Sequence, residues 1–196
     1  MPANQMHDVG NTMNFQRFQG SDGPMPLAIA ARLDDHLSKT IDRLRQDLLV
    51  RAPNAEKQLD YPPHITLAVI EDGERVDPMI QQLAAACQNI GQLKIKMSNF
   101  GIFSGIPSYV FLAPVVTQSL LALHENIVEA VRGQKIHEHH LVGSWVPHVT
   151  VATLTGKPEK ALEAAMRNFD HHDGHITAIE LVQFPPVEIL ASFPLQ

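Results

Sequence analysis

The chain has 196 residues, of which 44% are hydrophobic and 18% are charged. This composition can build an apolar core and excludes an intrinsically disordered chain, while the length favours one domain or one domain of two similar lobes. The formal net charge of −6 disfavours a protein that grips long nucleic acid through a basic surface. A single cysteine, Cys87, excludes an internal disulfide and a zinc site built from cysteines.

Residues 1–26 are rich in Asn, Gln, Gly, Asp and Pro and show no apolar periodicity. We expect a flexible N-terminal tail there and a folded domain over residues 27–196. The tail lacks the pattern of an export signal, and no apolar stretch reaches the roughly 18 residues of a membrane span. We therefore expect a cytoplasmic protein that does not contact a membrane.

The first half of the domain alternates between strand patterns and helix patterns. In chain order it predicts a strand at Leu27–Leu33, a helix capped by Asp34 or Asp35 that ends before Pro53, a strand at His64–Ile70, a helix with Asp77 as its cap and Pro78 at its first position, and a strand at Leu93–Phe103.

The second half repeats this order. It predicts a strand at Tyr109–Val116, a helix capped by Thr117, a strand at Trp145–Leu154, a helix opened by Lys157 and Pro158, a strand at His175–Phe184 and a final strand at Val187–Phe193.

Matching positions in the two halves lie at similar offsets. The first strands start 109 − 27 = 82 residues apart, two strand histidines lie 148 − 64 = 84 apart, and the helix prolines lie 158 − 78 = 80 apart. Such self-similarity indicates a duplicated β-α-β-α-β unit. We predict an α+β fold with two pseudo-symmetric lobes, approximately residues 27–104 and 105–196, around a central cleft.

The second strands of the two halves carry the same motif, PHITLA at 63–68 and PHVTVA at 147–152. Alternate residues of a strand share a face. The side chains expected together on one face are His64, Thr66 and Ala68 in the first strand and His148, Thr150 and Ala152 in the second. A third triplet, His175-Ile176-Thr177, lacks the proline and is out of phase with the repeat, so we interpret it as structural.

Two histidines and two threonines that face one cleft suit phosphodiester chemistry. Imidazole titrates near pH 6.5, so one ring can take a proton from water or a ribose hydroxyl while the other gives one to the departing oxygen. Threonine hydroxyls can hydrogen-bond the phosphate oxygens. This layout requires neither a metal nor another cofactor. The alternative is that both histidines are ordinary strand residues.

These paired His-hydrophobic-Thr-hydrophobic motifs resemble the two-histidine phosphoesterase superfamily, and its 2′-5′ RNA ligase-like branch in particular, from Leu27 to the C-terminus. The resemblance implies a bilobal α+β body, catalytic His64 and His148, and phosphate-binding Thr66 and Thr150. It also implies metal-independent action on 2′,3′-cyclic or 2′-5′ phosphodiesters of nucleotides or short RNA ends, by hydrolysis or by reversible bond formation.

Four further residues are candidates for binding substrate. Tyr61 and Trp145 each lie three residues before a motif histidine, where an aromatic ring stacks on a base or packs one lobe on the other. Tyr109, close to Phe103, is expected to border the cleft. Arg32 ends the first strand and either reaches a phosphate or stays solvated.

The remaining histidines have simpler interpretations. His137, Glu138, His139 and His140 have donor atoms that suit zinc or nickel, but their spacing favours a mobile, solvated loop and no metal. Two other residues and one segment are placed by their patterns: His124 as a partnered core histidine, Cys87 as a small core residue, and the 171–173 segment as the charged end of the fourth helix.

We therefore predict a monomeric phosphodiesterase whose partner is a small nucleotide or a short RNA end. Three alternatives remain: a non-catalytic nucleotide-binding or RNA-end-binding module of the same fold, a metallohydrolase that uses residues 137–140, and a scaffold whose polar strand faces are covered.

Overall fold

The computed structural model describes residues 25–56, 61–73, 75–167 and 170–196. Its elements form two consecutive units with three long strands and two helices each, followed by β8, and the short β2 lies within the first unit. In chain order they are β1 (Leu27–Leu33), α1 (Asp35–Arg51), β2 (Ala55–Glu56), β3 (His64–Ile70), α2 (Val76–Cys87), β4 (Leu93–Phe103), β5 (Ser108–Pro114), α3 (Gln118–Ala130), the 3-10 helix η2 (Glu138–His140), β6 (Val149–Leu154), α4 (Glu159–Arg167), β7 (His172–Gln183) and β8 (Glu188–Pro194). The predicted alternation is confirmed, and the structure adds β2 and η2. Residues 1–24 of the predicted tail lie outside the described residues.

The strands form one antiparallel sheet in the order β2-β6-β5-β4-β7-β1-β3, with β8 paired to β7. The last strand of each unit pairs with the first strand of the other unit: β4 with β5, and β7 with β1. β4 and β7 also pair with each other and join the halves of the sheet. The predicted α+β class is confirmed. The lobe boundary near residue 104 stays a prediction, and the last strands are exchanged across it.

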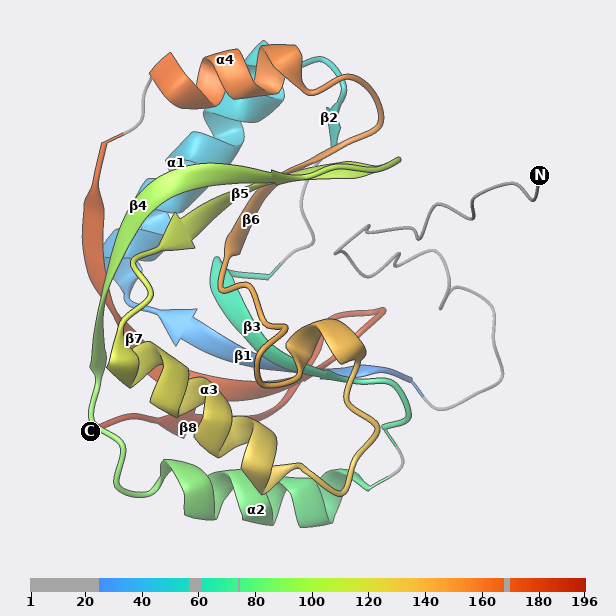
Figure 1. Ribbon diagram of the computed structural model, residues 1–196, viewed down its shortest axis with the longest axis vertical. Coiled ribbons are helices and arrows are strands. Elements are labelled where there is room, and N and C mark those ends of the chain that lie inside the picture. The colour runs from blue at the N-terminus through green and yellow to red at the C-terminus, as the bar shows by residue number, and fades with distance from the viewer. Residues whose placement is uncertain (1–24, 57–60, 74, 168–169) are drawn as a thin grey trace, which may run out of the picture.

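The sheet curves so strongly that strands far apart in its order come together. β3 ends the order on one side and β6 is next to the end on the other, yet the two strands are in contact. Helices α1 and α4 pack together at one end of the molecule, and α2 and α3 at the other (Figure 1). The curvature therefore brings the two histidine-bearing segments next to each other.

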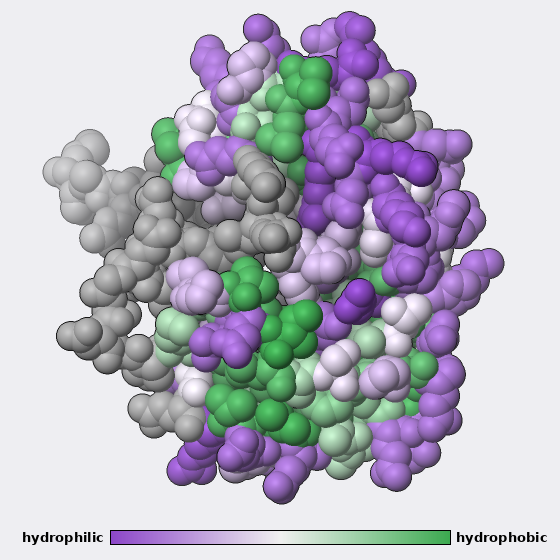
Figure 2. Space-filling view, turned by 180° about the vertical axis from the view of Figure 1, so that it is seen from behind, coloured by the Kyte–Doolittle hydropathy of each residue, from purple (hydrophilic) through white to green (hydrophobic). Residues whose placement is uncertain are grey.

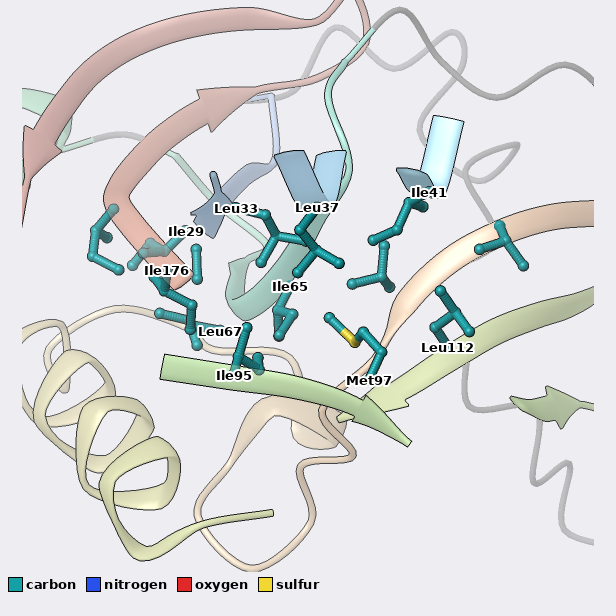
Figure 3. Close-up of a cluster of buried hydrophobic side chains, with 14 of the residues drawn as sticks. Ile29, Leu33, Leu37, Ile41, Ile65, Leu67, Ile95, Met97, Leu112 and Ile176 are labelled. Atoms are coloured by element: carbon teal, nitrogen blue, oxygen red, sulfur yellow. The ribbon is translucent and has the colours of Figure 1, made fainter. Parts of the chain in front are cut away.

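One large cluster of buried aliphatic side chains fills the space between helices and sheet. Figure 3 shows Leu37 and Ile41 of α1 beside Ile65, Met97 and Leu112, which come from strands of both units. All five side chains are fully buried. Burying a side chain of this size contributes roughly 1.5–3 kcal/mol, so a core shared by both units stabilises them as one body.

Two of the predicted helix caps are confirmed. The Asp34 carboxylate accepts a hydrogen bond of 2.8 Å from the backbone N–H of Leu37 at the start of α1. The Thr117 hydroxyl accepts one of 3.2 Å from the N–H of Leu120 at the start of α3. Each bond satisfies a backbone donor that has no partner inside the helix.

The predicted cap at Asp77 is wrong. Helix α2 already begins at Val76, so Asp77 and Pro78 lie inside its first turn. Proline is tolerated there because the N–H groups of a first turn have no partner within the helix. A carboxylate in this turn also interacts favourably with the helix dipole.

Two other boundaries differ from the sequence prediction. The strand expected from Trp145 starts only at Val149, because the preceding segment contains Pro147, which has no N–H for the ladder. His172 and Asp173 do not end the fourth helix but belong to β7, where they pair with β4. Cross-strand hydrogen bonds, rather than a helix dipole, account for their placement.

The surface differs between the two ends of the molecule. Seen from behind, hydrophilic residues predominate at the end that carries α1 and α4, whereas a larger group of apolar residues lies in the opposite half (Figure 2). None of the helices in the described part of the chain has both the length and the apolar character needed to cross a bilayer.

Candidate active site

Both motif histidines are anchored by the same backbone contact. His64 is the first residue of β3, and His148 comes immediately before β6. The Nδ1 atom of His64 lies 2.8 Å from the carbonyl oxygen of Pro62, and that of His148 lies 2.7 Å from the carbonyl oxygen of Val146. Because a carbonyl oxygen can only accept, we place the ring hydrogen on Nδ1, which leaves the lone pair of each neutral ring on Nε2.

A β-bulge follows the threonine in each motif strand. In the ladder between β1 and β3, Thr66 and Ala68 pair with adjacent residues of β1, so Leu67 is the extra residue. The ladder between β5 and β6 has the same irregularity at Val151. The two bulges lie 151 − 67 = 84 residues apart, the same offset as the histidines. Bulges of this kind re-aim side chains beside functional sites.

The bulges correct one prediction about the motif faces. Ala68 and Ala152 do not share the polar face of the histidines but join the buried core beside Leu67 and Val151. An inserted residue reverses the alternation of the strand, so the strict two-residue period fails after it. His64 and Thr66 lie before the bulge and stay half-buried on the polar side.

Each bulged strand is held by a side chain from the other unit. The indole Nε1 of Trp145 donates to the carbonyl oxygen of Thr66 at 2.9 Å. The guanidinium of Arg45 donates to the carbonyl oxygen of Thr150 from Nε at 3.3 Å and from Nη2 at 3.0 Å. These bonds cross between the units, so they fix the two motif strands relative to each other.

The two imidazoles are close enough to influence each other electrostatically. Burial above all lowers the pKa of His64, to about 4, with smaller contributions from the positive charges of Arg45 and His148 and against the bond to Pro62 and the negative charge of Glu180. Burial also lowers the pKa of His148, against its bond to Val146. Both rings are therefore neutral at pH 7 in the free protein.

A buried ionic network borders His64. The Glu180 carboxylate on β7 is 1% exposed and accepts hydrogen bonds from Tyr61 Oη at 2.7 Å and from Arg32 Nη1 at 2.9 Å. The Tyr61 ring lies 4.6 Å from the His64 ring, centroid to centroid. Arg32 pairs directly with His64 in the β1–β3 ladder. We name His64, Thr66 and this network the first half-site.

An aromatic wall borders His148 instead. Phe103 meets the His148 ring edge-on with centroids 4.9 Å apart, and Phe111 lies 5.3 Å away. The two phenyl rings stack on each other at 4.3 Å. Gly101 makes room for them, because a Cβ there would overlap the Phe111 ring. We name His148, Thr150 and this wall the second half-site.

The two other aromatic candidates are already engaged inside the protein. Tyr109 is 6% exposed and belongs to the cluster of Phe103 and Phe111, so its ring is packed. Trp145 stacks on His124 with centroids 4.0 Å apart and nearly parallel planes. The predicted contacts of Tyr109 and Trp145 with substrate stay predictions.

The histidine-rich segment at 137–140 is only partly solvated, because Glu138 is exposed and the three histidines are half-buried. Its residues 138–140 form η2, and Nδ1 of His140 is buried without a hydrogen-bond partner. The His140 carbonyl bonds His124 Nε2 at 3.0 Å, which confirms His124 as a partnered core histidine. Burial, then the charges of His137 and of His148, lower the pKa of His140 to about 3. Within the described ranges, no group of three or more His, Cys, Asp or Glu side chains is arranged to hold a metal.

Sequence reasoning missed three residues of this site: Glu180, Arg45 and Phe111. Glu180 left a signal, because it is a single carboxylate between Ile179 and Leu181 in an apolar strand. Arg45 also left a signal, because it lies four residues after Ile41 and three before Leu48, at the edge of the apolar face of α1. Phe111 lies in an apolar strand and does not stand out. The third triplet lies outside the site: His175 contacts Asp34 at the start of α1.

The chain is also similar in sequence to known proteins. The family model described as the 2′-5′ RNA ligase superfamily matches residues 33–185. A Bacillus licheniformis protein with the provisional name phosphoesterase is 27% identical over 95 residues, which are 46% of this chain and 52% of that protein. The match thus spans about half the length of this relative.

Solved structures share the fold. TT0787 of Thermus thermophilus superposes with a TM-score of 0.62 and 16% identity, over 87% of this chain and 98% of that chain. Escherichia coli LigT, crystallised with 3′-AMP, gives a TM-score of 0.62 and 14% identity, over 89% of this chain and 99% of that chain.

Proposed function

Because this chain belongs to the 2′-5′ RNA ligase superfamily, a family with phosphoesterase relatives, we propose that it is a metal-independent phosphodiesterase. Its substrates are 2′,3′-cyclic or 2′-5′ phosphodiesters of nucleotides or of short RNA ends. His64 and His148 are its acid–base pair. The observation that carries this proposal is the duplicated anchoring of two imidazoles whose Nε2 atoms remain available, at the starts of two strands that contact each other.

Hydrolysis of a cyclic phosphate then needs two proton transfers. Nε2 of one neutral histidine takes a proton from water as the water oxygen bonds to phosphorus. The bond between phosphorus and one ribose oxygen breaks, and Nε2 of the other histidine, protonated beforehand, gives its proton to that oxygen. Acid and base exchange roles when the bond is formed in reverse, so the same pair serves hydrolysis and ligation.

Binding of the anionic substrate favours protonation of one of the two histidines. Both histidines have lowered pKa values in the free protein because burial disfavours the imidazolium. A phosphodiester between the rings adds a negative charge that raises the pKa of both and favours one proton on the pair. Thr66 and Thr150, together with Arg32, bind the phosphate oxygens as charge moves onto them.

Small nucleotides are the substrate class that the comparisons support. E. coli LigT has been crystallised with 3′-AMP, with NADP+ and with ATP. The net charge of −6 also favours a short ligand over long RNA. Tyr61, Trp145 and Tyr109 are the proposed contacts to the nucleoside, and a monomer is the proposed active form.

The test is a product assay with the four 2′,3′-cyclic nucleotides and with 2′-5′-linked dinucleotides. We expect turnover of at least one substrate, and a loss of at least about 100-fold in His64→Ala and in His148→Ala. His175→Ala is the matched control, because it removes the histidine of the third triplet and is expected to keep full activity.

Two outcomes would overturn the proposal. Near-native rates in either motif variant would remove that histidine from the chemistry. Nucleotide binding by calorimetry without product from any substrate would instead make the protein a non-catalytic binding module of the same fold.

A further inference from the structure

Glu180 is the most deeply buried charged group among the described residues. Besides Tyr61 and Arg32, its carboxylate accepts a 3.3 Å bond from Ser192 Oγ on β8. The acceptor atoms are divided: Oε2 bonds Tyr61, and Oε1 bonds Arg32 and Ser192. A buried carboxylate is tolerated only when it is paired and hydrogen-bonded, and this one joins β1, β7, β8 and the segment before β3.

Both main partners of Glu180 flank His64. Arg32 is its neighbour across the β1–β3 ladder, and Tyr61 lies ring against ring with it. Only Nη1 of Arg32 bonds Glu180, and the Arg32 side chain is 41% exposed. Since a guanidinium has five N–H donors in a rigid fork, the remaining donors are open to an anion beside His64.

Fold stability alone does not require this network. Buried ion pairs are often no more stabilising than apolar residues of similar volume. In the second half-site of the same molecule, apolar side chains take the place of this ionic network. There, Ala113 follows the Leu112–Val149 pair and packs on the aromatic wall beside His148. The fold can thus place an uncharged residue beside a motif histidine. The first half-site has a carboxylate and a guanidinium there instead.

We propose that Glu180 is a positioning residue of the phosphodiesterase: it aims the Arg32 guanidinium at the phosphate of the substrate and fixes Tyr61 against His64. This inference rests on the proposed function and adds a residue that acts on the reaction through others. Glu180 itself touches no substrate.

The experiment measures kcat and KM of the full chain on its best cyclic nucleotide. We expect Glu180→Gln to lower kcat/KM by about 10-fold to 100-fold, because small misplacement of a substrate-binding group costs this much. Glu188→Gln is the matched control, since it neutralises an exposed carboxylate of the neighbouring strand β8.

A double variant separates positioning from general destabilisation. If Glu180 acts through Arg32, then adding Glu180→Gln to Arg32→Met costs little beyond Arg32→Met alone. Independent effects would multiply instead and would overturn the inference. Arg43→Met, an exposed arginine of α1, controls for the loss of a positive charge.

The pH profile gives a second readout. The charged and titratable groups that act on or contact His64 are Glu180 from β7, Arg45 from α1, His148 beside β6 and Tyr61 from the segment before β3, with Arg32 opposite on β1. The negative charge of Glu180 favours the protonated form of His64. Its removal lowers the pKa of His64 further, so one limb of the kcat/KM profile shifts to lower pH. Glu188→Gln leaves both limbs in place.

The outcomes are distinguishable. If wild type and controls are active, His64→Ala is inactive and Glu180→Gln matches wild type, the positioning role is wrong and the phosphodiesterase stands. If wild type cleaves no phosphodiester, the proposed function fails and this inference with it. If Glu180→Gln does not fold, Tyr61→Phe and Arg32→Met each remove one bond to the carboxylate, and wild-type kcat/KM in both would overturn the inference.

Discussion

The two half-sites share a backbone and differ in their walls. In each, a histidine donates from Nδ1 to a carbonyl two residues earlier, a bulge follows the threonine, and the threonine carbonyl accepts a bond from the other unit. Beside His64, however, lies an ionic network around Glu180, whereas Phe103 and Phe111 surround His148. The duplication has thus kept what aims the imidazoles and has changed what surrounds them, so the histidines are not interchangeable.

The largest expected effect comes from Gly101, which gives the aromatic wall its space. In Gly101→Ala the new methyl group overlaps the Phe111 ring, so this ring, which packs beside His148, must shift. We expect turnover to fall by about 100-fold from misplacement of His148. The measurement is steady-state kinetics beside thermal unfolding. Gly133→Ala is the control, since nothing lies near its Cβ position. Unchanged turnover in a folded Gly101→Ala protein would show that the wall does not orient His148.

The crossed bonds to the threonine carbonyls are the next test. Trp145→Phe removes the donor to Thr66, and Arg45→Met removes the donors to Thr150. Leaving a partly buried carbonyl without its partner costs about 1–3 kcal/mol, so both variants should unfold at lower urea concentration.

Only one of these two variants should also change the pH profile. The charge of Arg45 lowers the pKa of His64, so Arg45→Met should shift a limb to higher pH, whereas Trp145→Phe should not. Identical profiles in the two variants would contradict this difference between the half-sites.

Acid should destabilise the fold through the same histidines. The pKa of His64 is lowered to about 4 in the folded protein and is near 6.5 when the chain is unfolded, so the unfolded state binds more protons between these values. Stability is therefore present above about pH 6.5 and is lost as the pH falls toward 4. We expect the free energy of unfolding to drop by at least about 1 kcal/mol from pH 7 to pH 4.5. His64→Asn should flatten this slope in urea titrations, and an equal slope in that variant would place the proton uptake elsewhere.

The smallest expected effect is that of chelation. The histidine pair supplies both proton transfers, so EDTA should change turnover by less than about two-fold. A large loss of turnover in EDTA that zinc or nickel restores would instead assign catalysis to a metal at the 137–140 segment. The two half-sites would then not be the catalytic centre.

The order of elements and the motif pair could be predicted from sequence because both depend on local patterns. Helix caps such as Asp34 and the repeated PHxTxA strands need only neighbouring residues. The bulges at Leu67 and Val151 could not be predicted, since a bulge is defined by the partner strand. The reversed faces of Ala68 and Ala152 follow from those bulges.

The walls of the half-sites could not be predicted for a different reason. Arg32 and Glu180 lie 148 residues apart, and only the pairing of β1 with β7 brings them together. The predicted lobes divide the chain near residue 104, and the repeat gave no prediction of strand pairing; the last strands, β4 and β7, each pair with the first strand of the other unit. Long-range pairing decides these neighbours, and a single sequence carries no local trace of it.

The exchange of β4 and β7 makes each half of the chain depend on the other. Severed between residues 104 and 108, either piece would lose the strand that covers its own first strand and would expose a row of unpaired N–H and C=O groups. Each half is thus the template on which the other completes its sheet, so the two gain or lose their order as one cooperative unit.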